Sequence, residues 1–152
     1  MNSAARPLIF YPGTPVRFDC VPCLPIAEFR ETVVRDVAQG ARLAAFFGLE
    51  APMSEIKLVA ILAKPERGVL AALTTHPGDA YPALTTDCAQ AHLFEREVAE
   101  QWGICPQGHP WLKPLRFHAP FGKRRAVWAP ALAAGAQPGA SDFFQMTGEE
   151  NH

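Results

Sequence analysis

The sequence contains no apolar stretch long enough to cross a bilayer. Its longest apolar runs cover residues 43–49 and 58–63, whereas a spanning helix needs about 20 apolar residues. Residues 1–10 also lack a basic start followed by a long apolar run and a small-residue cleavage site. We therefore expect a protein that is neither exported nor integral to the membrane, located on the cytoplasmic side.

A strong net charge is also missing. The 152 residues sum to a formal charge of −1, with 19% charged and 49% apolar residues. This composition is typical of one globular domain with its own hydrophobic core. No overall electrostatic field directs the chain toward nucleic acid or a membrane surface, so only the distribution of charge along the chain is informative.

Cysteine is scarce, and its spacing is irregular. The four cysteines are Cys20, Cys23, Cys88 and Cys105. Without a secretory signal they are expected to be reduced thiols rather than a disulfide framework. Cys20 and Cys23 form a C-x-x-C pair, but a zinc or iron–sulfur site needs further ligands at matching spacing. We expect no metal in this chain, and a thiol redox role for the pair remains an alternative.

The common catalytic motifs are absent. The sequence has no glycine-rich phosphate loop ending in Lys-Ser or Lys-Thr, and no dinucleotide fingerprint after a strand. A Gly-x-Ser-x-Gly nucleophile turn is missing as well. We therefore expect neither catalytic nor cofactor-binding residues in this chain.

Helical spacing is clearest after an N-terminal arm over residues 1–24, which includes a strand-like run at residues 8–11. Pro25 stands where a helix accepts proline, because the missing N–H is not needed there. Apolar side chains then recur every three or four residues up to Gly40, a residue that favours a helix end. The spacing predicts an amphipathic helix over residues 25–39.

Three apolar runs, over residues 42–47, 56–63 and 68–74, predict three strands. The last two flank Lys64-Pro65-Glu66-Arg67, whose proline and charges suit a hairpin connection. We therefore expect these two strands to pair antiparallel.

A second helix is predicted over residues 90–102, with Thr86 or Asp87 as its N-cap and Gly103 at its end. Its apolar face consists of Ala91, Phe94, Val98 and Trp102. Together these elements predict an α+β fold, a two-layer sandwich with helices packed on a small mixed or antiparallel sheet.

Charge changes sign after the second helix. Residues 101–141 contain no acidic residue and carry a net charge of +5, against −3 for residues 1–100 and −3 for residues 142–152. Residues 130–141 have the Pro/Ala/Gly composition of a linker. The chain thus divides into an N-terminal arm (1–24), an α+β domain (25–118), a basic, then Pro/Ala/Gly-rich extension (119–141) and an acidic tail (142–152).

The densest group of motif residues begins in the second helix. Glu95-Arg96-Glu97 is followed by Gly103, by Gly108-His109-Pro110-Trp111-Leu112 and by Arg116. Neighbouring helical residues differ by about 100°, so the three charges cannot share one face. One interpretation is an ordinary solvated helix surface. The turn and the basic arm with Trp111 favour an interface instead, because Trp and Arg dominate interface energetics.

These blocks resemble a known family. The run from His92 to Glu97, then Trp102-Gly103-Ile104 and the segment from Gly108 to Arg116, looks like the signature of the 30 kDa subunit family of respiratory complex I, the NADH dehydrogenase. It is most similar to the related N-terminal domain of hydrogenase-3-type (formate hydrogenlyase) large subunits, the group 4 nickel–iron hydrogenases. Two departures are Glu100, where complex I members usually have Asp, and Cys105-Pro106, where an apolar or aromatic pair is usual.

The resemblance implies a non-catalytic docking subunit of a membrane-associated electron-transfer complex. Its partners would be the large (49 kDa or hydrogenase large) subunit and the small iron–sulfur subunit, which carry the clusters and the nickel–iron or quinone site. The tail resembles the opening of a fused large-subunit domain. The residues implied for the motif and interface are Glu95, Arg96, Glu97, Gly103, Gly108, His109, Pro110, Trp111, Leu112 and Arg116.

Two further interpretations concern the basic arm and the histidines. With Trp111, Phe117, Phe121 and Trp128, the arm could serve a nucleic-acid-binding module, although the resemblance implies no nucleic acid. His109 is expected to fix its turn by bonding a backbone carbonyl, and a proton-handling role is the alternative. His76, His92 and His118 have no partner identifiable from sequence. We also expect Arg96→Ala and Glu97→Ala to impair assembly more than folding.

Overall fold

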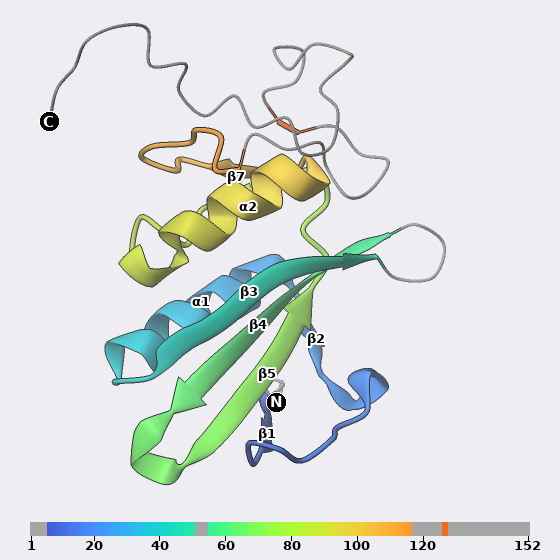
Figure 1. Cartoon of the computed structure of the whole chain (residues 1–152), viewed down its shortest axis with the longest axis vertical. Helices are drawn as coiled ribbons and strands as arrows, with labels where there is room; N and C mark the ends of the chain where they lie inside the picture. The colour runs from blue at the N-terminus through green and yellow to red at the C-terminus, as the bar shows by residue number, and fades with distance from the viewer. Residues whose placement is uncertain (1–5, 51–54, 117–125, 128–152) are drawn as a thin grey trace, which may run out of the picture.

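Figure 1 shows the computed structural model of the chain, which describes residues 6–50, 55–116 and 126–127. Two helices, α1 (Ile26–Ala38) and α2 (His92–Trp102), pack with a five-stranded mixed sheet. The predicted α+β two-layer sandwich is confirmed. The extension over residues 119–141, apart from residues 126–127, and the acidic tail over residues 142–152 lie outside the described residues.

Helix α1 agrees with its prediction to within one residue at each end. Pro25 is its N-cap, and the amide of Gln39 donates to the carbonyl of Arg35 at its C-terminus. Phe29 and Val33, one turn apart, are fully buried. The 3.6-residue spacing therefore places one apolar stripe of α1 in the core.

Three long antiparallel strands make up most of the sheet: β3 (Arg42–Glu50), which is an edge strand, β4 (Ile56–Lys64) and β5 (Val69–Thr75). A 3-10 turn, η3 (Pro65–Arg67), joins β4 to β5. Gly68 follows it at φ +61°, in the left-handed region that favours glycine. The predicted hairpin is confirmed, while β3 continues three residues beyond its predicted end.

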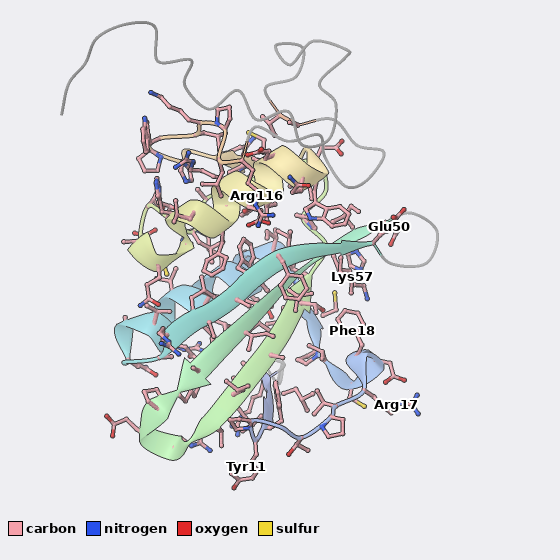
Figure 2. The ribbon with its side chains drawn as sticks, viewed as in Figure 1. Tyr11, Arg17, Phe18, Glu50, Lys57 and Arg116 are labelled. Atoms are coloured by element: carbon pink, nitrogen blue, oxygen red, sulfur yellow. The ribbon has the colours of Figure 1, made fainter. Side chains whose placement is uncertain are left out.

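The N-terminal arm lies along the free edge of β5. Strand β1 (Leu8–Phe10) pairs antiparallel with β5, and β2 (Cys23–Leu24) pairs parallel with its last two residues. Between them lies η1 (Phe18–Cys20), whose Phe18 ring is 6.0 Å from the ammonium of Lys57 (Figure 2). Leu24 is 3% exposed, so the end of this arm also reaches the core.

Both helices contribute to one core on a single face of the sheet. Phe46 of β3 packs with Phe29 of α1, with ring centroids 6.1 Å apart, and with Tyr81, at 6.4 Å. Two residues further along the same face of β3, Gly48 lies against Trp102 of α2. A register shift between Leu43 and Ala45 sets this phase.

The start of α2 differs from its prediction. A 3-10 turn, η4 (Ala89–Ala91), precedes the helix, and Ala91 is the N-cap, with no side-chain hydrogen bond. Thr86 and Asp87 do not cap the helix but bind the guanidinium of Arg30 on α1. The two candidate cap side chains thus connect α1 to the loop that precedes η4 and α2.

A second, two-stranded sheet was not predicted. Strands β6 (Ala80–Pro82) and β7 (Cys105–Gln107) pair parallel. Each has three residues, one of them proline, which argues against a strand in sequence analysis. Strand β7 begins three residues after the end of α2, so its pairing with β6 keeps the segment after α2 close to that helix. In Figure 1 the segment after α2 lies on the side of the helix away from the sheet.

Within the described residues, no helix is both long enough and apolar enough to traverse a membrane.

Candidate functional site

Glu95 is completely buried at 0% exposure. Its carboxylate accepts hydrogen bonds from the amides of Leu84 (2.7 Å) and Thr85 (2.9 Å) and from the Thr85 hydroxyl (2.5 Å). Three donors compensate for the water lost on burial, which an isolated carboxylate would not tolerate. The expectation that the motif charges lie at a surface is wrong for Glu95, because this side chain anchors the loop before α2.

Tyr81 adjoins this buried carboxylate and is 1% exposed. Burial raises the pKa of Tyr81 well above its usual value, and the negative charge of Glu95 raises it further. Although the phenol lies close to Glu95, it forms no hydrogen bond of acceptable geometry with any described residue. Tyr81 is therefore a neutral core phenol next to a structural carboxylate.

Arg96 faces the segment that follows α2. Its Nε donates to the carbonyl of Lys113 at 2.8 Å, and a terminal nitrogen donates to the carbonyl of Pro114 at 2.7 Å. The guanidinium lies 4.9 Å from the Trp111 ring centre, within cation–π range. The side chain is only 7% exposed. Arg96 thus fixes the backbone of residues 113–114.

Glu100 and Glu97 hold the same segment one step further along. The Glu100 carboxylate, 1% exposed, accepts the amides of Leu115 (2.6 Å) and Arg116 (3.0 Å). Glu97 forms an ion pair with Arg116 at 2.6 Å, with side chains 36% and 52% exposed. Arg116 lies beside α2 in Figure 2. The Glu97–Arg116 ion pair is therefore accessible to solvent, whereas the side chains of Glu95, Arg96 and Glu100 are buried.

His109 uses both ring nitrogens to fix its turn. Nε2 lies 3.2 Å from the carbonyl of His92, and Nδ1 accepts the amide of Trp111 at 3.1 Å. With Nδ1 as the acceptor, Nε2 is the nitrogen that donates to the carbonyl. The predicted bond from His109 to a backbone carbonyl is confirmed.

His92, expected to lack a partner, stacks on both His109 and Trp111, with centroids 5.0 and 5.9 Å away. Burial lowers the pKa of His92, and the neighbouring His109 and Arg96 lower it further. His76 was also without an expected partner and lies 3.7 Å from Glu55. His118 lies outside the described residues.

The remaining motif residues are structural or exposed. Gly103 and Gly108 have φ of +64° and +79°, so each turn requires a residue that accepts the left-handed region. Leu112 is half-buried, Pro110 is exposed, and Trp111 is 51% exposed. The structure thus brings the ten predicted residues to α2 and the segment after it.

The cysteines form no common centre. Cys20 and Cys23 are exposed beside the sheet edge, whereas Cys88 is buried, and this burial raises the pKa of its thiol. No cluster of three or more His, Cys, Asp or Glu side chains suited to a metal ion occurs among the described residues. Tyr81 and Thr85 were not predicted from the sequence, because only their contact with Glu95, ten or more residues away, distinguishes them.

The fold and this network define a class: an α+β domain whose motif carboxylates anchor its own loops. In a comparison with protein families, residues 26–125 match the family described as respiratory-chain NADH dehydrogenase, 30 Kd subunit. The match covers well over half of the chain, so the chain belongs to this family. It is therefore a subunit of a respiratory-type oxidoreductase complex and has partner subunits there. A comparison with curated proteins gives no match.

Proposed function

We propose that the chain is a non-catalytic docking subunit, which packs on the catalytic large subunit of a membrane-associated electron-transfer complex. The observation that carries this proposal is the use of the motif charges. Glu95, Arg96 and Glu100 all bind backbone groups of the chain itself. Such a network shapes a rigid surface and leaves none of these three groups free to act as an acid or base.

The finer assignment follows the residues from His92 to Arg116. Their similarity to hydrogenase-3-type large-subunit domains supports a complex of the group 4 nickel–iron hydrogenase type, and family membership equally suits an NADH:quinone oxidoreductase. In either complex, the large subunit and a small iron–sulfur subunit would carry the clusters and the nickel–iron or quinone site. The chain would then lie peripherally on the cytoplasmic side of the membrane.

Isolation of the native complex tests this proposal. The chain is expressed in its source cell with an N-terminal affinity tag, extracted from membranes in mild detergent and purified. We expect the large and iron–sulfur subunits to co-purify in fixed proportion, with nickel present if the complex is a hydrogenase. The chain expressed alone should bind neither iron nor nickel nor flavin. Recovery as a lone monomer, or a cluster bound to the isolated chain, would contradict the docking role.

A further inference from the structure

The segment after α2 exposes an aromatic ring and basic side chains around Trp111. Trp111, Lys113 and Pro110 are exposed there, and Arg116 lies at the margin. We call these four residues the Trp111 patch. On the basis of the proposed docking function, we infer that the Trp111 patch binds a carboxylate-bearing segment of the partner subunit.

The Trp111 side chain is held in place by its neighbours. The Trp111 ring stacks on His92 at an interplanar angle of 2°, and Arg96 lies 4.9 Å from its centre. Its backbone amide is bound by His109, and the following backbone is bound by Arg96. An aromatic side chain that is already ordered loses little entropy on binding, which is the property of an interface anchor.

The patch also exposes hydrogen-bond donors that have few acceptors among the described residues. The ammonium of Lys113 lies 5.1 Å from the Trp111 ring and has no ion pair with any described residue. The indole N–H of Trp111 likewise has no hydrogen-bond partner in the described part of the chain. The half-exposed guanidinium of Arg116 forms an ion pair with the carboxylate of Glu97. Water can solvate these exposed donors in the free chain, and a partner carboxylate that replaces this water satisfies both the charge and the donors.

Two acidic residues of α2 do not neutralise this surface, because their side chains are buried. Glu95 and Glu100 of α2 are 0% and 1% exposed, and backbone amides occupy their oxygens. Among the three acidic residues of α2, Glu97 is the one that reaches solvent. Two of the three glutamates of α2 are thus internal, and the segment after the helix presents Lys113 and Arg116 to solvent. These exposed cations are complementary to an acidic partner.

An apolar margin completes the patch. Leu93 is 53% exposed and lies one helical turn before Arg96 and Glu97, so it shares their face of α2. An exposed leucine on the helix face that carries Arg96, whose guanidinium lies over Trp111, favours a protein segment with an apolar residue next to its carboxylate. Adsorption to anionic lipid takes clusters of about four to eight basic residues, whereas this patch presents two exposed cations.

The test uses the full chain in its native complex. A carbodiimide joins a lysine amine directly to a carboxylate in contact with it, so the purified complex is cross-linked and digested for mass spectrometry. We expect a cross-link from Lys113 to an Asp or Glu of a partner subunit. Lys113→Glu and Trp111→Ala should each reduce recovery of that subunit by about tenfold or more.

The variants are chosen to spare folding. Arg96 binds the backbone carbonyl of Lys113, so the side chain can change without loss of that bond. Arg67→Glu, in the exposed turn η3 far from α2 (Figure 1), is the matched charge-reversal control and should leave recovery unchanged. Thermal melting of each isolated variant confirms that it folds.

The outcomes separate the two proposals. Absence of partner subunits even with the unaltered chain would overturn the docking function itself. An intact complex with Lys113→Glu and Trp111→Ala, or Lys113 cross-links confined to this chain, would overturn the Trp111 patch alone. Flotation of the chain with phosphatidylcholine–phosphatidylglycerol vesicles, lost with Lys113→Glu while subunit recovery persists, would overturn it in favour of a lipid surface.

Discussion

Gly48 of β3 lies directly beneath the indole ring of Trp102 on α2. A Cβ atom at Gly48 would come within 2.5 Å of Trp102 Cδ1 and Nε1, closer than real Cβ contacts. The glycine is required here by the closeness of the helix to the strand. This contact sets how near α2 lies to the sheet, and with it the position of the network built on α2.

Gly48→Ala should therefore destabilise the protein, by about 1–3 kcal/mol, as overpacking of a well-filled site does. Urea unfolding followed by circular dichroism measures the change in the free energy of unfolding. The control is a double-mutant cycle with Trp102→Leu, in which the added methyl has room. If Gly48→Ala costs as much in the Trp102→Leu background as beside the native indole, the close contact is not what requires glycine.

Two glutamates on α2, only two positions apart, should differ sharply in their effect on stability. Glu95→Ala leaves the buried amides of Leu84 and Thr85 without an acceptor and should cost roughly 2–4 kcal/mol. Glu97→Ala removes a solvent-accessible pair with Arg116 and should cost well under about 1 kcal/mol. Denaturant unfolding of both variants measures the difference. Equal losses would show that the buried network is not what stabilises α2.

Local signals predicted most of the fold. Helix α1 was found from Pro25 and the spacing of Phe29 and Val33, and the β4–β5 hairpin from its apolar runs and Pro65. These signals act over a few residues. Strand β7 carries no such signal, because its pairing with β6 joins segments more than twenty residues apart and each strand contains proline.

The candidate site shows the same limit. The motif residues were identified, but whether Glu95 faces solvent depends on the loop at Leu84 and Thr85 returning to α2. A prediction from hydrophobic periodicity treats every charged side chain as polar and places it on the solvent-exposed face of the helix. It has no means of showing that backbone amides from another segment compensate for burial.

Arg96 should not be replaceable by lysine. Its planar guanidinium reaches the carbonyls of Lys113 and Pro114 at the same time, whereas an ammonium is a single point with a different reach. Arg96→Lys should therefore loosen residues 113–116 by about 1–2 kcal/mol, while the sheet stays intact. Hydrogen exchange measured by mass spectrometry should show faster exchange at the amides of Leu115 and Arg116.

Exchange in β4 is the internal reference for that variant. It should match the unaltered protein, because β4 makes none of the bonds that Arg96 makes. Unchanged exchange at both places would mean that the network does not hold the segment, and faster exchange everywhere would mean that Arg96 supports the whole fold.

The His92 side chain should make the protein less stable in acid. Burial and the nearby His109 and Arg96 lower its pKa below the ordinary value of about 6.5, against a smaller opposite effect from Glu95. The unfolded chain therefore binds a proton at a higher pH than the folded protein does. The contribution of His92 to stability is complete above pH of about 6.5 and is lost as the pH falls from there through the lowered pKa.

His92→Phe tests this directly, because phenylalanine keeps a flat ring against His109 and Trp111 but does not titrate. The free energy of unfolding is measured between about pH 8 and pH 5, by urea titration at each pH. The variant should be close to the unaltered protein at the upper limit and lose less stability at the lower one. An identical decline in both proteins would assign the acid sensitivity to another group, since the His92 ring would then contribute stacking alone.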